Sequence, residues 1–313
     1  MSVYDKNLDK NEANFVPLSP LTFLERTKDV YPDYEAAVYG NRKYTWLDIY
    51  KRVTRFASAL EKIGVGNSDT VSIMACNTPE LFEAHYSIPM TGAVINAINT
   101  RLDSKTVAYI LEHSDAKVLI VDRQFHKVIK KALENVKRKI IIIDIDDKQA
   151  NLTDQGKIGD HEYESFLKTG DENYQWKKPK DEWQAIALNY TSGTTGQPKG
   201  VVYHHRGSYL MSVGSVTAWN MPNKLTYLYT VPMFHCNGWG YPWTLALLHA
   251  KVIFIRNIVV KEIFKLIVEN KVTHFGGAPI VLNMMANAPK NEQLPIKEKV
   301  YVMTAGAPPP SSI

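Results

Sequence analysis

Apolar and polar positions in the first half of the chain follow the order expected when helices connect neighbouring strands. Short runs rich in β-branched residues predict buried strands, and segments with helical spacing lie between them. The predicted strands are 71–75, 118–121 and 140–143, and the predicted helices are 80–86, 106–113 and 125–136. This order is typical of β-α-β crossovers, so it predicts a mostly parallel sheet.

Local signals at the start of the chain predict two helices and a hairpin. A helix is expected near 21–30, and a tight turn at Gly40 predicts a short hairpin. Thr45 and Asp48 occupy the capping-box positions of a second helix, whose apolar residues recur at helical spacing until Gly64. The apolar face of this helix is expected to pack inward.

A polar stretch divides the chain. We predict an N-terminal α/β subdomain over 1–145, a polar connector over 146–181 and a second α/β subdomain over 182–313. In the second subdomain, strands are predicted at 185–190, 227–231, 252–255, 273–275 and 300–303, and helices at 207–219, 239–248, 261–269 and 280–286. The expected fold class is α/β, with two subdomains whose largely parallel sheets are flanked by helices and with the ligand site near the cleft between them.

Composition excludes several classes of protein. The chain is 45% hydrophobic and 22% charged with a net charge of +5, and its lysines are dispersed, so no nucleic-acid-binding face is expected. Cys76 and Cys236 are too few and too far apart for a disulfide framework or a zinc site. The start lacks a secretory pattern, and the most apolar stretch, 243–255, is too short for a membrane span. We therefore expect a cytoplasmic protein.

The segment from Tyr190 to Gly200 carries the clearest chemistry. It follows a predicted strand, and its glycines allow a tight backbone turn whose amide groups can face one anion. The expected phosphate-binding residues are Thr191, Ser192, Gly193, Thr194, Thr195, Gly196 and Lys199. Hydroxyl groups and the Lys199 charge would add donors for phosphate oxygens. The spacing matches neither a Walker A loop nor a dinucleotide-binding loop, and the competing interpretation is an ordinary surface turn.

The full string Tyr-Thr-Ser-Gly-Thr-Thr-Gly-x-Pro-Lys-Gly-Val resembles the signature of the AMP-forming ligase superfamily. That superfamily includes acyl-CoA synthetases, luciferases and peptide-synthetase adenylation domains. The resemblance extends over nearly the whole chain and is nearest to short- and medium-chain acyl-CoA ligases, such as plant butyrate and benzoate ligases. Its other motifs are 14–24, 90–96, 99–102, 232–239, 272–279 and 303–310.

The resemblance implies an acyl-CoA ligase that works through an acyl-adenylate. A carboxylate would attack the α-phosphorus of ATP, magnesium pyrophosphate would leave, and coenzyme A would then displace AMP. ATP, Mg²⁺ and coenzyme A are therefore the implied cofactors and co-substrates, and a short, medium or aromatic carboxylic acid is the implied partner. Thr191 corresponds to the hydroxyl associated with magnesium in the family, and Lys199 would contribute to catalysis.

His235 corresponds to the family position beside the acyl pocket. It would orient the carboxylate and the adenylate by a hydrogen bond, because a carboxylate needs no deprotonation near neutral pH. Without the motif, His235 would be read as a packed loop residue. Trp239 and Trp243 could line the same pocket, although two aromatic residues one helical turn apart are more often part of a core.

Gly306, Ala307 and Pro308 correspond to the family turn that lies against adenine. Small residues there would let the backbone meet the flat base, whereas the competing interpretation is a proline-rich loop.

The sequence lacks the family motif Tyr-Gly-x-Thr-Glu, the ribose-binding aspartate and the small C-terminal domain with its catalytic lysine. We therefore expect a truncated chain, weakly active or inactive, whose ATP–pyrophosphate exchange with short carboxylic acids stays near background. Two alternatives remain open at this point. One is an adenylating enzyme that transfers the acyl group to a carrier protein or to oxygen chemistry. The other is a non-catalytic nucleotide-binding module. The oligomeric state is not predicted.

Overall fold

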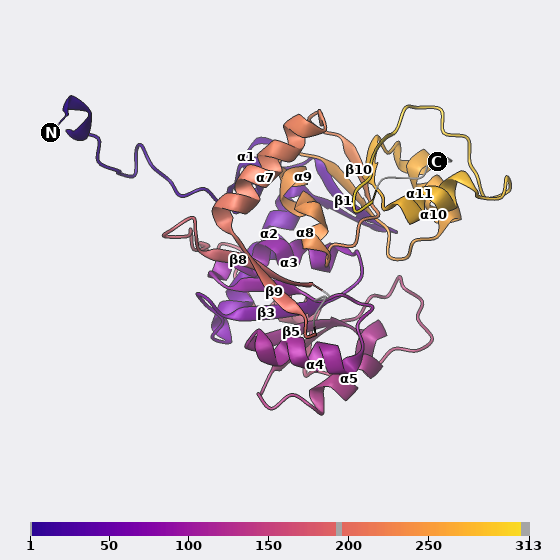
Figure 1. Ribbon diagram of the computed structural model, residues 1–313, viewed down its shortest axis with the longest axis horizontal. Helices are drawn as coiled ribbons and strands as arrows, with labels where there is room; N and C mark the ends of the chain where they lie inside the picture. Colours follow the sequence, from indigo (N-terminus) through magenta and orange to yellow (C-terminus); the bar gives the residue numbers. More distant parts are fainter. Residues whose placement is uncertain (1, 192–195, 308–313) are drawn as a thin grey trace.

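A computed structural model describes residues 2–191 and 196–307 of the chain and contains two sheets (Figure 1). The seven-stranded sheet has the order β7-β6-β5-β3-β4-β8-β9, and the six-stranded sheet has the order β13-β12-β10-β11-β1-β2. Neighbouring strands are parallel except in the pairs β8–β9 and β1–β2. The predicted α/β class with largely parallel sheets is confirmed.

The strands of the seven-stranded sheet are β3 (Thr70–Met74), β4 (Val94–Ala97), β5 (Ala116–Asp122), β6 (Ile141–Ile145), β7 (His161–Glu162), β8 (Ala185–Thr191) and β9 (Lys199–His204). Those of the six-stranded sheet are β1 (Glu35–Tyr39), β2 (Arg42–Thr45), β10 (Thr226–Tyr229), β11 (Lys251–Phe254), β12 (His274–Gly276) and β13 (Tyr301–Met303). The first two strands thus join the later sheet, and β8 and β9 join the earlier one. The sheets cross the boundaries predicted at 145 and 182, and the division of the chain into separate folding units stays a prediction.

The α-helices are α1 (Leu21–Val30), α2 (Trp46–Lys62), α3 (Pro79–Ser87), α4 (Ser104–His113), α5 (His126–Leu133), α6 (Tyr163–Leu167), α7 (His205–Ala218), α8 (Cys236–Trp239), α9 (Tyr241–Leu247), α10 (Val260–Asn270) and α11 (Pro279–Ala286). Three short 3-10 turns are η1 (Val3–Asp5), η2 (Pro89–Thr91) and η3 (Arg123–Phe125). The capping box predicted for α2 is confirmed, since Thr45 and Asp48 each accept the other's backbone N–H. Among the described residues, no helix is both long and apolar enough to cross a membrane.

Alternating side chains on the strands build three apolar layers. Val71 and Ile73 of β3 pack with Tyr227 and Tyr229 of β10 in a central core between the sheets, around α1, α2, α3 and α9. Met74 faces the opposite way, into a layer under α4 and α5. A third layer lies between the six-stranded sheet and α10 and α11. Each sheet is therefore covered on both faces, which explains the continuous apolar runs of its inner strands.

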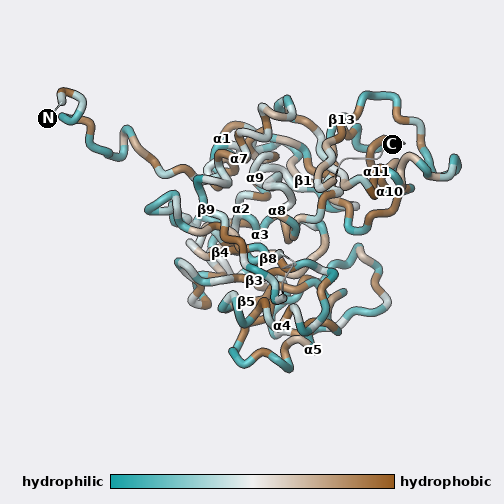
Figure 2. The backbone as a smooth tube through the Cα atoms, viewed as in Figure 1, coloured by the Kyte–Doolittle hydropathy of each residue, from teal (hydrophilic) through white to brown (hydrophobic). Residues whose placement is uncertain are grey.

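One edge of the seven-stranded sheet is less covered. Figure 2 colours β9 brown, as a hydrophobic segment, and Val202 of this last strand is 62% exposed. The strand has one hydrogen-bonded neighbour, β8, in the described sheet order.

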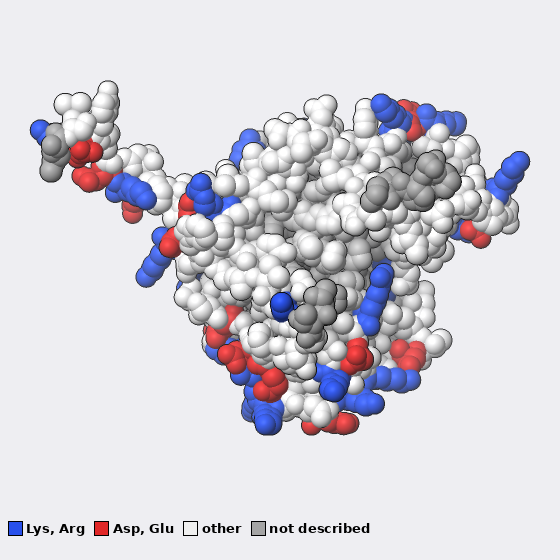
Figure 3. All heavy atoms as spheres, in the orientation of Figure 1, with Lys and Arg blue, Asp and Glu red and all other residues white. Residues whose placement is uncertain are grey.

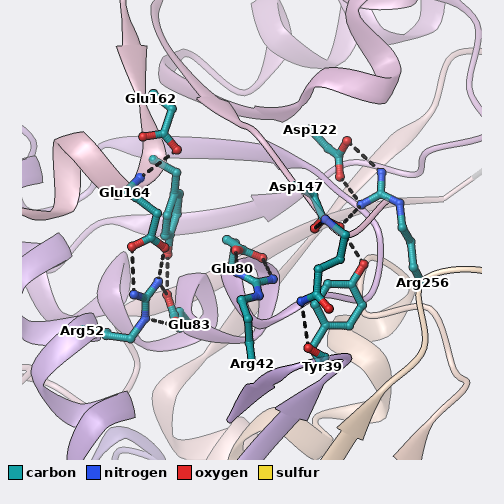
Figure 4. A network of polar contacts seen from close by, with 12 residues as sticks. Tyr39, Arg42, Arg52, Glu80, Glu83, Asp122, Asp147, Glu162, Glu164 and Arg256 are labelled. Carbon is teal, nitrogen blue, oxygen red and sulfur yellow. Dashed lines mark hydrogen bonds and ion pairs between the residues drawn. The ribbon is translucent and has the colours of Figure 1, made fainter. Parts of the chain in front are cut away.

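Buried ion pairs connect the layers (Figure 4). The Arg256 guanidinium follows β11 and binds both carboxylate oxygens of Asp122, at the end of β5, with N–O distances of 2.7 and 2.9 Å. It also donates to Asp147 at 2.9 Å, and Tyr39 donates to that carboxylate at 2.6 Å. The side chains of Arg256 and Asp122 are only 6% and 1% exposed. This network links the carboxyl end of a strand in each sheet.

We predict that Arg256→Met lowers the free energy of unfolding by about 3–5 kcal/mol, because it leaves the Asp122 and Asp147 carboxylates buried without their cation. Urea denaturation of the purified chain measures this loss. Arg138→Met is the matched control: Arg138 pairs with Asp115, whose side chain is 81% exposed, and its loss should cost about 0–1 kcal/mol. Equal losses in the two variants would contradict the assigned role.

Three buried histidines predict a loss of stability in mild acid. Burial lowers the pKa of His85 to about 4, and burial followed by the charge of His204 lowers that of His205 to about 4. Burial followed by the charges of Arg26 and Lys224 lowers the pKa of His249 to about 4. The unfolded chain binds protons near pH 6.5, so stability is complete above that pH and falls as the pH drops toward 4. Between pH 7 and pH 5 each histidine should cost about 1–2 kcal/mol. Urea titrations at both pH values measure the loss. His205→Asn should reduce it by about one third, and an unchanged pH dependence would contradict the prediction.

Candidate active site

The two strands that flank the predicted phosphate loop, β8 and β9, pair as a hairpin. Thr191, the last residue of β8, pairs with Lys199, the first residue of β9, and both are exposed. Cross-strand partners project from the same face of a hairpin, so the hydroxyl and the ammonium leave the sheet together. Gly196 has a φ of 139°. Four predicted phosphate-binding residues, Ser192, Gly193, Thr194 and Thr195, lie outside the described residues.

Sequence reasoning missed the second strand of this hairpin, because it assigned Lys199 and Gly200 to the loop and began the next helix at 207. The run Val201-Val202-Tyr203 was an available strand signal. The hairpin fixes the register between Thr191 and Lys199, which a free loop would not do.

Tyr190 anchors the hairpin directly beside the Thr191–Lys199 pair. Its hydroxyl forms a 2.8 Å hydrogen bond with Nδ1 of His113, at the end of α4, and the two rings meet edge to face. Burial raises the pKa of Tyr190 to about 12, so the phenol stays protonated. The contact connects the hairpin to the helix layer beneath the seven-stranded sheet.

The structure brings Thr191 and His235 to one cavity. This cavity has a volume of about 260 Å³ and is also lined by Asn189, Tyr203, Phe234 and Cys236. His235 follows β10, as predicted, and its side chain is exposed. Figure 3 shows the face that carries the hairpin: its middle is mostly uncharged but holds isolated Lys or Arg side chains, and further charged side chains lie toward its borders. A larger cavity, of about 610 Å³, lies between the β1–β2 turn and α10 and contains none of the predicted site residues.

The predicted adenine turn follows β13 at the edge of the six-stranded sheet. Gly306 has a φ of 92°, a conformation that favours glycine, and both Gly306 and Ala307 are exposed. No hydrogen bond joins these two residues to the hairpin within residues 2–191 and 196–307. Pro308 lies outside the described residues.

The short element α8, which directly follows His235, is a left-handed turn and not a right-handed helix. Cys236, Asn237, Gly238, Trp239 and Gly240 have φ values of 47°, 51°, 57°, 61° and 67°. The turn is closed by two hydrogen bonds, from Gly238 N–H to the His235 carbonyl and from Gly240 N–H to the Asn237 carbonyl, both 2.9 Å long. The helix predicted from 239 therefore begins at Tyr241, because the left-handed residues cannot continue into a right-handed helix.

The turn separates the two tryptophans considered for the acyl pocket. Trp243 is 1% exposed and donates a 3.1 Å hydrogen bond to the His85 carbonyl, so it belongs to the central core. Trp239 is partly buried and packs against that core. Asn237 is 1% exposed, and neither polar atom of its amide has a protein partner among the described residues.

Two asparagines that sequence reasoning assigned no role contact the backbone before His235. Asn77 makes three hydrogen bonds to residues 229–233, and Asn189 donates one to the Phe234 carbonyl. Asn189 directly precedes the loop motif that begins at Tyr190. No sequence signal indicated Asn77, since its partners are more than 150 positions away.

The described residues contain no group of three or more His, Cys, Asp or Glu side chains that could hold a metal ion. A single hydroxyl at Thr191 fits a magnesium ion only if phosphate oxygens and water supply most of the ligands, which is how magnesium is usually bound with nucleotides.

We predict that Gly238→Ala destabilises the chain by about 2–3 kcal/mol, because a Cβ at this left-handed position would lie 2.2 Å from the buried Tyr229 hydroxyl oxygen. Thermal and urea unfolding measure the loss. Tyr229→Phe removes the clashing oxygen, so the double variant should lose less than the sum of the single variants. Strict additivity would show that the close approach to Tyr229 is unimportant.

Comparison with known proteins identifies related chains. Residues 24–313 match the family described as AMP-binding enzyme. The peroxisomal acetate/butyrate–CoA ligase of Arabidopsis thaliana is 46% identical over 318 residues, which cover 98% of this chain and 56% of that protein. The acetate–CoA ligase of Humulus lupulus is 44% identical with the same coverage. The chain thus spans little more than half the length of these curated relatives.

Solved structures share the fold. The N-terminal domain of FACL13 from Mycobacterium tuberculosis has a TM-score of 0.80 and 24% identity, covering 94% of this chain and 71% of that one. The o-succinylbenzoate CoA synthetase of Bacillus subtilis, bound to its acyl-adenylate intermediate, has a TM-score of 0.75 and 22% identity, covering 92% and 68%.

Proposed function

This chain belongs to the AMP-binding enzyme family. From that premise we propose that its activity is that of an ATP-dependent acid–thiol ligase, which works through an acyl-adenylate. One observation carries the proposal: the Thr191–Lys199 pair ends a hairpin, and Thr191 shares a cavity with His235. A hydroxyl and an imidazole thus line one cavity, and the ammonium of Lys199 belongs to the strand partner of Thr191; activation of a carboxylate by ATP uses groups of these kinds.

The proposed roles follow from charge. Lys199 and the backbone of the hairpin tip bind the phosphates of ATP and stabilise the charge that develops when pyrophosphate leaves. Thr191 would contribute its hydroxyl to a magnesium ion, for which phosphate oxygens and water would supply most of the ligands. His235 donates a hydrogen bond that orients the acid, whose carboxylate oxygen attacks the α-phosphorus. Coenzyme A then displaces AMP from the acyl-adenylate.

We propose that the turn at Gly306, Ala307 and Pro308 binds the adenine ring of ATP. Its support is the exposed left-handed backbone at Gly306, where a Cβ would meet no atom within 4 Å and the approach of a flat base is open.

We propose short carboxylic acids, such as acetate and butyrate, as substrates. The support is the names of the Arabidopsis and Humulus relatives, which are the acetate/butyrate and acetate ligases described above.

We also propose a cytoplasmic location. The competing location is the peroxisome, because the Arabidopsis relative is named as a peroxisomal protein. A fluorescent fusion imaged in the native host distinguishes the two.

Acid-dependent exchange of pyrophosphate into ATP tests the reaction. It is measured with acetate, butyrate and the aromatic acid benzoate on the 313-residue chain and on a chimera that adds the unmatched part of the Arabidopsis relative. Exchange followed by coenzyme A thioester formation supports the proposal, whereas transfer only to a carrier protein would reassign the acceptor. A folded chimera that activates none of the acids would refute the function.

Lys199→Met should weaken MgATP binding at least tenfold, because the variant loses a charge-assisted contact worth about 1.5–3 kcal/mol. Isothermal titration of the chain with MgATP measures the change. Lys105→Met removes a charge from the exposed start of α4 and should leave the dissociation constant within twofold. Equal effects of the two variants would mean that only net charge matters.

A further inference from the structure

The segment between β10 and His235 is held by the opposite sheet. Residues 230–234 follow a strand of the six-stranded sheet, yet their side-chain hydrogen-bond partners include Asn77 and Asn189 of the seven-stranded sheet. Asn77 lies three residues beyond the end of β3, and Asn189 lies within β8. Both side chains are buried, with 7% and 6% exposure.

Asn77 uses its whole amide on this segment. Its Nδ2 donates to the carbonyls of Tyr229 and Val231 at 2.9 and 2.8 Å, and its Oδ1 accepts the N–H of Met233 at 2.9 Å. One side chain thus satisfies three backbone groups of an irregular segment that contains Pro232 and cannot satisfy them in a sheet. An apolar side chain of the same size could fill the space but could not bind these groups.

Asn189 holds the next residue. Its Nδ2 donates to the Phe234 carbonyl at 3.1 Å, directly before His235. Its Oδ1 is buried without a protein partner among the described residues, and the side chain lines the cavity that Thr191 and His235 share. The backbone on the N-terminal side of His235 is therefore fixed at residues 229, 231, 233 and 234, while the left-handed turn fixes the C-terminal side.

We propose that Asn77 and Asn189 form an asparagine clamp that positions His235 relative to the phosphate hairpin. The role of His235 toward the acid rests on the proposed function, whereas the positioning itself rests on the hydrogen bonds above. Asn189 and Thr191 both belong to β8. Through the clamp, the seven-stranded sheet therefore determines the position of His235 as well as that of the phosphate hairpin. Neither asparagine needs to touch the reacting atoms.

Hydrogen–deuterium exchange of the 313-residue chain tests the clamp. Asn77→Leu should accelerate exchange in the peptide 229–236 at least tenfold, because the Met233 N–H loses its acceptor and the Tyr229 and Val231 carbonyls lose their donor. Asn189→Leu should accelerate it by a smaller factor. Exchange in the β5 peptide 116–122 should stay within twofold of the unsubstituted chain in both variants.

Asn96→Leu is the matched control. Asn96 is a fully buried asparagine of β4 in the same sheet, and its hydrogen bond goes to Ser72, not to the His235 segment. The clamp is supported if exchange in 229–236 responds to Asn77→Leu and Asn189→Leu but not to Asn96→Leu. Equal responses in all three variants, or none in the first two, would overturn it. If Asn77→Leu does not fold, the comparison of Asn189→Leu with Asn96→Leu decides alone.

A kinetic measurement separates positioning from general stability. In a preparation that forms acyl-adenylate, Asn77→Leu should lower kcat at least tenfold and leave the dissociation constant of MgATP within twofold, because the hairpin binds ATP without the His235 segment. Equal losses in both quantities would contradict a positioning role. If no acid is activated, the proposed function fails, and the exchange experiment still decides whether the clamp exists.

Discussion

Hydrogen bonds that cross from one sheet to the other determine where the candidate site lies. The central core between the sheets is apolar, and apolar contact alone tolerates small sliding of one layer over another because it has no direction. The asparagine clamp and the Arg256–Asp122 pair are directional, and each joins the carboxyl end of a strand in one sheet to the segment after a strand in the other. The relative placement of Thr191 and His235 depends on such contacts.

These connections lie in the interior, where their geometry decides whether they stabilise the fold. A buried amide or guanidinium costs free energy unless its donors and acceptors are paired. Asn77 has both donors and its acceptor paired, and Arg256 is matched by the carboxylates of Asp122 and Asp147. Asn189 and Asn237 keep polar atoms without protein partners among the described residues, and Asn189 lines the cavity of the site. The unpaired Oδ1 of Asn189 is thus available to a ligand or water in that cavity, while the hydrogen bonds of Asn77 and Arg256 hold the layers together.

Local sequence patterns predicted most elements but not their pairing. The capped helix after Thr45 and the apolar strands were predictable because capping and periodicity act over a few residues. The assignment of β1 and β2 to the later sheet was not predictable, since the pairing of β1 with β11 joins residues more than 200 positions apart. Strand β9 was missed because the glycines of the loop motif dominated the interpretation of its first residues. The resemblance supplied the identity of Thr191, Lys199 and His235, but their proximity needed the three-dimensional structure.

The left-handed turn shows why sequence alone could not place His235. Asn tolerates positive φ better than most residues, but Cys236 and Trp239 do not, and each such residue costs about 1–2 kcal/mol. The cost persists only if the surroundings fix the backbone on both sides. On one side the asparagine clamp holds residues 229–234, and on the other the Tyr229 hydroxyl donates to the Gly238 carbonyl at 3.0 Å. The turn and the clamp therefore require each other. Without the clamp, the strained backbone of the turn could relax. Without the turn, the clamp would hold residues 229–234 but would leave the direction of the His235 side chain unfixed.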